Sequence, residues 1–174
     1  MTHIGSASGK KEPSGIRRPA MNRRAQISLT PDEQRDYLAQ SHTIILVSND
    51  RHGFPHPVAM WYLVEPDGAV AMTTFRKSQK ALNLRRDSRC TLLLESGRTY
   101  PELKGLIIRG RAEIDDDTER VLDVLEAVQH KYNPGHVEGL RDMLRGQASK
   151  RCVVRVRPER VSSWDHAKLG ADVY

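Results

Sequence analysis

Short apolar runs separated by turn residues occupy the middle of the chain. Residues 43–48 (TIILVS) are a continuous apolar run that ends in the turn residues 49–53, a pattern typical of a buried strand. Residues 56–64 are rich in β-branched and aromatic side chains, and the sequence EPDG at 65–68 interrupts them before residues 69–74 resume an extended pattern. The last two runs therefore predict a β-hairpin.

Helical periodicity and further strands alternate along the rest of the chain. Capping residues and spaced apolar residues predict helices over residues 28–40, 78–86 and 118–131. Residues 131–146 are expected to be irregular or briefly helical. Further strands are expected at 90–94, 106–114, 152–156 and 161–164. With hairpins and short helices as connections instead of regular βαβ crossovers, the pattern predicts an α+β fold: an antiparallel barrel of about six strands flanked by short helices.

Length and charge predict one folded domain that follows a basic tail. The chain has 174 residues, 38% of them hydrophobic, and a formal net charge of +6. Residues 1–25 contain six Lys or Arg against Glu12 alone, so this stretch contributes +5 of that charge. We expect a disordered basic tail over residues 1–25 and a folded domain over residues 26–174. Nucleic-acid binding is disfavoured, because a basic footprint should lie on a folded face.

Several classes of protein lack sequence support. Cys90 and Cys152 are too few and too far apart for a zinc motif or a disulfide scaffold, and no acidic cluster has the spacing of a metal site. No apolar run reaches the roughly 20 residues of a membrane span, and no signal peptide is recognisable. The motifs of serine hydrolases, zinc proteases and nucleotide-binding loops are also absent. We expect a cytoplasmic protein without a bound metal or a membrane contact.

Hydroxyl and ammonium groups concentrate where the strand at 69–74 gives way to the helix at 78–86. The backbone N–H groups at the start of a helix have no partner within the helix, so cations and hydroxyls beside them form a suitable site for a phosphate. The residues of this kind are Thr73, Thr74, Lys77, Ser78 and Lys80. This stretch, residues 73–80, is called the strand–helix corner below.

Four segments together resemble a known superfamily: TIILVS with its turn, HPVAMWY followed by EPDG, TTFRKSQKALNLRRD, and SWDHAKLG near the end. Their order and spacing resemble the flavin- and deazaflavin-dependent split β-barrel oxidoreductases, the pyridoxamine 5'-phosphate oxidase-like superfamily. NLRRD and SWDHAKLG look most like actinobacterial members that use the deazaflavin coenzyme F420. The chain lacks the arginine-rich C-terminal substrate segment of true pyridoxamine phosphate oxidases, which argues against vitamin B6 chemistry.

The resemblance implies a homodimer of split barrels with two cofactor clefts between the subunits. The cofactor ring would lie along Pro57, Val58, Ala59, Met60 and Trp61. The phosphate would meet Thr73, Thr74, Lys77, Ser78, Gln79 and Lys80. Trp164, with Asp165, His166 and Lys168, would close the cleft from the partner subunit. Met60 and Trp61 are also explained as core or interface residues, since both types commonly pack there.

The leading functional hypothesis is an oxidoreductase that transfers hydride from reduced F420 to an unsaturated small molecule. FMN is the alternative cofactor; the extra cations Arg76 and Arg85 favour F420, which has a longer anionic tail. A non-catalytic carrier of F420, a flavin or a tetrapyrrole is the second hypothesis. The sequence contains no convincing acid/base pair, which is compatible with hydride transfer, because the cofactor carries that chemistry.

Overall fold

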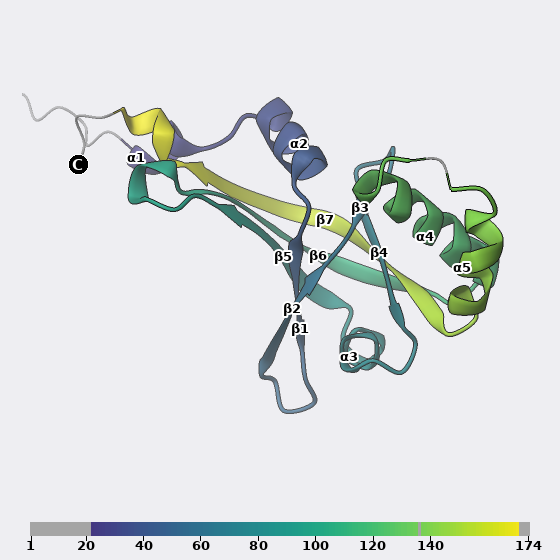
Figure 1. Ribbon diagram of the computed structural model, residues 1–174. Coiled ribbons are helices and arrows are strands. Elements are labelled where there is room, and N and C mark those ends of the chain that lie inside the picture. Colours follow the sequence, from purple (N-terminus) through teal and green to yellow (C-terminus); the bar gives the residue numbers. More distant parts are fainter. Residues whose placement is uncertain (1–21, 136, 171–174) are drawn as a thin grey trace, which may run out of the picture.

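Seven strands form one curled antiparallel sheet, with helices packed against it, in the computed structural model (Figure 1). The structure describes residues 22–135 and 137–170. The strands, in chain order, are β1 (Ile44–Asn49), β2 (Pro55–Met60), β3 (Leu63–Val64), β4 (Val70–Phe75), β5 (Arg89–Ser96), β6 (Lys104–Asp115) and β7 (Arg151–Asp165). Their order in the sheet is β2-β1-β5-β6-β7-β4-β3. The predicted α+β split-barrel class is therefore confirmed.

Five α-helices and two short 3-10 helices are present among the described residues. They are α1 (Arg23–Ile27), α2 (Pro31–Gln40), α3 (Gln79–Arg86), α4 (Thr118–Tyr132), α5 (Leu140–Ala148), η1 (Tyr100–Glu102) and η2 (His166–Leu169). The three predicted helices are confirmed as α2, α3 and α4. The N-cap of α4 is Asp117 and not the predicted hydroxyl of Thr118, because the Asp117 carboxylate accepts the Arg120 backbone N–H at 2.8 Å.

Two apolar clusters lie on opposite faces of β4 and β7. The larger one lies inside the curl of the sheet and includes Ile44, Leu92 and Tyr62. The second forms where α4 and α5 pack on the other face of β4 and β7 (Figure 1), and it includes Ala71 and Val153. Both faces are buried at residues 70–72 of β4 and 152–154 of β7, and these two segments (VAM and CVV) are continuous apolar runs.

The predicted hairpin over residues 56–74 is largely wrong. The run 56–64 divides into β2, which pairs with β1, and β3, which pairs with β4. The division falls at Trp61 and Tyr62, and the Tyr62 side chain is fully buried with its hydroxyl donating to the Leu38 carbonyl at 2.5 Å. Apolar composition predicts an extended chain, but it does not identify the strand with which each half pairs.

The end of the chain also differs from the expectation. The two predicted strands at 152–156 and 161–164 are one strand, β7, which continues through Pro158. Pro158 lies opposite Gly110, beside an irregularity between Arg109 and Gly110, so the missing N–H of the proline is tolerated there. Residues 140–148, within or beside the stretch expected to be irregular or briefly helical, form the nine-residue α5.

The basic stretch predicted at residues 1–25 lies mostly outside the described residues. Its last residues begin α1, which contacts η2 and β7. Within residues 22–135 and 137–170, no helix combines the length and apolar character that crossing a membrane requires.

Candidate functional site

The strand–helix corner is held by its own hydroxyl groups. Ser78 is the N-cap of α3, and its Oγ accepts the Ala81 backbone N–H at 3.4 Å. The Oγ1 of buried Thr74 lies 3.1 Å from the Ser78 Oγ, and the Thr74 carbonyl accepts the Cys152 thiol at 3.7 Å. Thr74 therefore positions the cap of α3 from within the core.

A buried amide joins α3 to β1. Asn83 is fully buried, and its Nδ2 donates to the Oγ of Ser48 at 3.1 Å. The Gln79 Nε2 donates to the Asn83 Oδ1 at 2.8 Å, so the Gln79 amide is directed along the helix. Asn83 therefore helps to hold α3 against β1.

The cations around the corner fall into two groups. Arg85 makes two hydrogen bonds to Asp116, at 2.7 and 2.8 Å, and Arg76 lies 3.5 Å from the same carboxylate. Lys77 is exposed and Lys80 is half-buried, and neither has an ion pair among the described residues. Burial lowers the pKa of Lys80, and the positive charge of Arg151 lowers it further. Of these four cations, the two lysines are therefore available to an anionic ligand, and Arg76 and Arg85 are already paired.

A hollow of about 400 Å³ lies beside the corner, between the end of β2, the strands β4 and β7, and the helices α4 and α5. It is called the α4–α5 hollow here. Its lining consists of Ala59, Met60, Trp61, Thr73, Leu125, Val128, Gln129, Leu144, Gln147 and Arg151. The Trp61 ring is 52% exposed and stacks on Tyr132 of α4, with centroids 4.5 Å apart and planes within 7°. Such a lining suits a flat ring ligand with a few polar groups.

A second hollow borders the corner itself. Phe75, Arg76, Lys77 and Ser78 line it on one side, and Ser149 and Lys150 on the other. Its volume is about 610 Å³. Both hollows therefore border the α5–β7 junction, residues 147–151.

The predicted ring-binding residues do not form a single wall in one chain. Along β2, Pro57 and Ala59 are exposed and Val58 and Met60 are half-buried, because alternate residues of a strand point to opposite faces. Of the predicted run, Ala59, Met60 and Trp61 border the α4–α5 hollow.

Trp164 lies far from the corner within one chain. It is near the C-terminal end of β7, whereas Arg151 begins that strand beside α5 (Figure 1). Trp164 pairs with Gly105 of β6, and a Cβ on Gly105 would lie 2.0 Å from the indole ring. Asp165 pairs with Lys104 at 3.4 Å, and Lys168 pairs with Glu33 at 2.5 Å. These contacts stabilise the C-terminal end of β7 against β6 and hold η2 to α2.

The sequence alone did not predict the side chains that α4, α5 and the start of β7 contribute to the candidate site. Tyr132, Gln129 and Gln147 lie on helices whose placement over β4 is a tertiary feature. For Arg151, one feature of the sequence could have indicated a fixed position. It directly precedes the apolar run CVV and is therefore held at the start of a buried strand.

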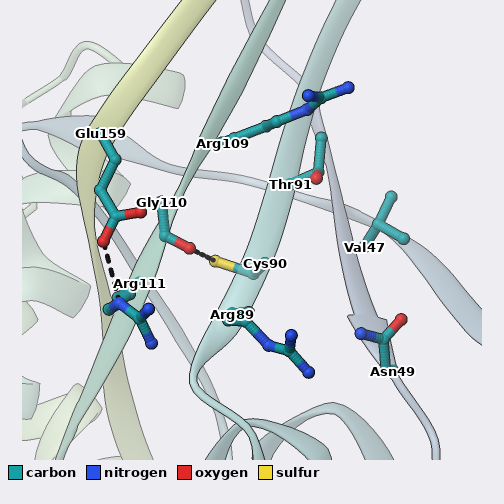
Figure 2. A pocket seen from close by; sticks show the side chains of 9 residues that line it. All are labelled: Val47, Asn49, Arg89, Cys90, Thr91, Arg109, Gly110, Arg111 and Glu159. Carbon is teal, nitrogen blue, oxygen red and sulfur yellow. Dashed lines mark hydrogen bonds and ion pairs between the residues drawn. The ribbon is translucent and has the colours of Figure 1, made fainter. Parts of the chain in front are cut away.

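A third hollow, of about 260 Å³, lies on β1, β5 and β6 and is rich in arginine (Figure 2). Arg111 pairs there with Glu159 at 2.9 Å, and Arg89 pairs with Asp87 at 2.8 Å. Figure 2 shows the Cys90 thiol directed at the Gly110 carbonyl, 3.7 Å away. Burial raises the pKa of Cys90 to about 12, so this thiol is not a nucleophile near neutral pH.

Among the described residues, no group of three or more His, Cys, Asp or Glu side chains is arranged to hold a metal ion. The split barrel with a cationic strand–helix corner beside a hollow that contains Trp61 defines a class of ligand-binding β-barrel proteins. Residues 30–165 match the family model described as pyridoxamine 5'-phosphate oxidase. The chain belongs to this family.

Solved structures agree with this assignment. The chain is 40% identical to the conserved hypothetical protein Rv2991 from Mycobacterium tuberculosis, with a TM-score of 0.79 over 84% of this chain and 91% of that one. It shares the fold of an F420 reductase (19% identity, TM-score 0.60, 74% and 94% covered). It also shares the fold of HutZ, the heme storage protein from Vibrio cholerae (16% identity, TM-score 0.60, 76% and 94% covered). No curated protein matches the sequence.

Proposed function

We propose that this protein is an oxidoreductase that binds coenzyme F420 and reduces an unsaturated small molecule, with FMN as the alternative cofactor. The observation that carries the proposal is the pair Lys77 and Lys80, without described carboxylate partners, beside a hollow lined by Trp61 and Thr73. Lysine ammonium groups and the N-terminus of α3 suit a phosphate, and the mostly apolar hollow with the Trp61 ring suits a flat ligand. When bound, the reduced deazaflavin would supply a hydride.

The chain's own residues would bind and orient the ligands. Lys77, Lys80 and the cap of α3 would hold the phosphate, and Trp61 would pack against the ring. The lining of the α4–α5 hollow contains no Asp, Glu or His. Its protein groups would therefore position the reactants and exclude water, without proton transfer by a carboxylate or an imidazole.

We also propose that the protein acts as a homodimer. Ile45, Leu93 and Ile107 are consecutive cross-strand partners on one face of β1, β5 and β6, and each is only half-buried. A contiguous apolar row of this kind suits a twofold interface. Light scattering of wild type, Leu93→Glu and the control Leu82→Glu tests this: we expect a dimer in wild type and control and a monomer in Leu93→Glu. A monomeric wild type would refute the dimer.

Fluorescence titration tests the cofactor proposal. Purified protein is titrated with F420 and, separately, with FMN at the same ionic strength. We expect tighter binding of F420, and turnover of reduced F420 with quinones or enones as acceptors. Preference for FMN would assign the flavin alternative, and binding of neither would refute the proposal.

A carrier function is the second candidate, because the hollow lacks an acid or a base and because the fold is shared with a heme storage protein. It predicts tight binding of F420, a flavin or heme without turnover of any acceptor. Sustained oxidation of reduced F420 by a catalytic amount of protein would exclude it.

A further inference from the structure

Arg151 has an unusual environment for a charged side chain. It begins β7 opposite Phe75 of β4, and its guanidinium carbon lies 4.5 Å from the centre of the Phe75 ring. The Arg151 Nε is buried and has no hydrogen-bond partner, and it is the only side-chain nitrogen or oxygen in this state among the described residues. A buried donor without a partner destabilises a fold, so such a group calls for an explanation.

The charge of Arg151 is also uncompensated. No carboxylate of the described residues pairs with it, while Arg76 and Arg85 share Asp116 on the same side of the corner. Its positive charge acts on Lys80, where it adds to burial in lowering the pKa of that lysine. An anion between the two would satisfy both groups.

The position of Arg151 matches a ligand that spans the site. Arg151 lines the α4–α5 hollow together with Thr73 and Trp61, and the adjacent Lys150 lines the hollow at the corner. Arg151 therefore borders the ring-sized space and is adjacent in sequence to a residue that lines the hollow of Lys77.

We propose that Arg151 is a phosphate-binding residue and that the protein thereby selects phosphorylated ring ligands over the same rings without phosphate. This inference rests on the proposed function. The planar guanidinium, held over Phe75, would donate to two phosphate oxygens at once, an arrangement that a lysine cannot reproduce. Because the unpartnered Nε is buried, it would gain an acceptor only if the side chain turned toward the bound ligand.

The test compares FMN with riboflavin, and F420 with its phosphate-free deazaflavin chromophore, by fluorescence titration. The variants are Arg151→Gln, Arg151→Lys and the control Arg157→Gln, an exposed arginine of the same strand. We expect Arg151→Gln to weaken binding of the phosphorylated ligands about 10- to 100-fold and that of the phosphate-free rings less than about 2-fold. Arg151→Lys should fall between, and Arg157→Gln should match wild type.

Folding of the variants is checked by thermal unfolding without ligand, where we expect Arg151→Gln within about 4 °C of wild type because no carboxylate loses its partner. If it unfolds, Arg151→Lys carries the comparison. Equal losses of affinity for phosphorylated and phosphate-free rings, or no loss of affinity for either, overturn the inference about Arg151. Neither result contradicts the proposed function.

If wild type binds neither cofactor, a measurement with inorganic phosphate still tests the role of Arg151 independently of the proposed function. At constant ionic strength, phosphate should raise the unfolding midpoint of wild type and of Arg157→Gln, because a ligand that binds the folded state stabilises it. It should not raise that of Arg151→Gln. Equal responses in all three proteins overturn the inference.

Discussion

Replacing Asn83 by Ala should destabilise both the fold and the strand–helix corner. The Asn83 side chain is fully buried and is the described hydrogen-bond donor to the Ser48 hydroxyl, which is itself 1% exposed. The substitution removes that bond at 3.1 Å, the bond from Gln79 at 2.8 Å and a longer bond from Arg86 at 3.3 Å. The helix α3 would lose one of its side-chain hydrogen bonds to β1 and keep the one from Arg86 to the Asn49 carbonyl at 2.5 Å.

The expected loss in the free energy of unfolding follows from the buried polar groups that the substitution leaves without a partner. A buried hydroxyl without a partner costs about 1–3 kcal/mol, and the partly filled space adds roughly 1 kcal/mol. We therefore expect Asn83→Ala to lower the free energy of unfolding by about 2–4 kcal/mol. Because α3 carries Ser78 and Lys80, affinity for a phosphorylated ligand should fall about tenfold in the same variant.

Urea unfolding followed by circular dichroism measures this effect. A double-mutant cycle with Ser48→Ala should give a coupling of about 0.5–3 kcal/mol, since the two side chains bond each other. The control Leu82→Ala removes a 48% exposed side chain of the same helix and should stay within about 0.5 kcal/mol of wild type. A loss below about 0.5 kcal/mol in Asn83→Ala, or no coupling to Ser48, would refute the reasoning.

Three further predictions concern other parts of the molecule. Gly110→Ala should destabilise the protein by more than about 3 kcal/mol in urea unfolding, because a Cβ would lie 2.0 Å from the Arg157 carbonyl oxygen; a smaller loss would contradict the close approach at this irregularity. Burial raises the pKa of Cys90 from 9.0 to about 12, so the folded state holds the thiol proton more tightly; this stabilisation is full below pH 9 and is lost as the pH rises from 9 to 12. Cys90→Ala should therefore reduce the decline of unfolding free energy above pH 9 by up to about 1.4 kcal/mol per pH unit, and an unchanged decline would contradict burial as the cause. A ring ligand in the α4–α5 hollow should quench the fluorescence of Trp61, so Trp61→Phe should abolish most of the quenching; the same loss in Trp164→Phe instead would place the ligand elsewhere.

The sequence was most informative where local chemistry decides the structure. The helices α2 and α3 begin where a hydroxyl cap predicts, at Thr30 and Ser78, because an N-cap acts on backbone groups within three residues. The apolar runs at 43–48 and 90–94 were correctly predicted as strands for a similar reason, since composition and turn residues limit an extended segment at both ends.

Strand pairing was beyond local reasoning. The run 56–64 has the composition of one strand, yet β2 and β3 pair with different neighbours because burial of Tyr62 bends the chain between them. Likewise, Pro158 predicts a break in β7, but its place opposite Gly110 lets the strand continue.

The sequence by itself determined the strand–helix corner, because Ser78, Lys77 and Lys80 follow one another within four residues at a cap. Only the tertiary structure decided which charges there are available. It brings Asp116, thirty-one residues after Arg85, onto Arg85 and Arg76. It also places Arg151 near Lys80, and no carboxylate in the part of the chain that the structure describes pairs with either one. Charge pairing depends on distance in space, and for residues this far apart along the chain that distance is set by the packing of the sheet and helices.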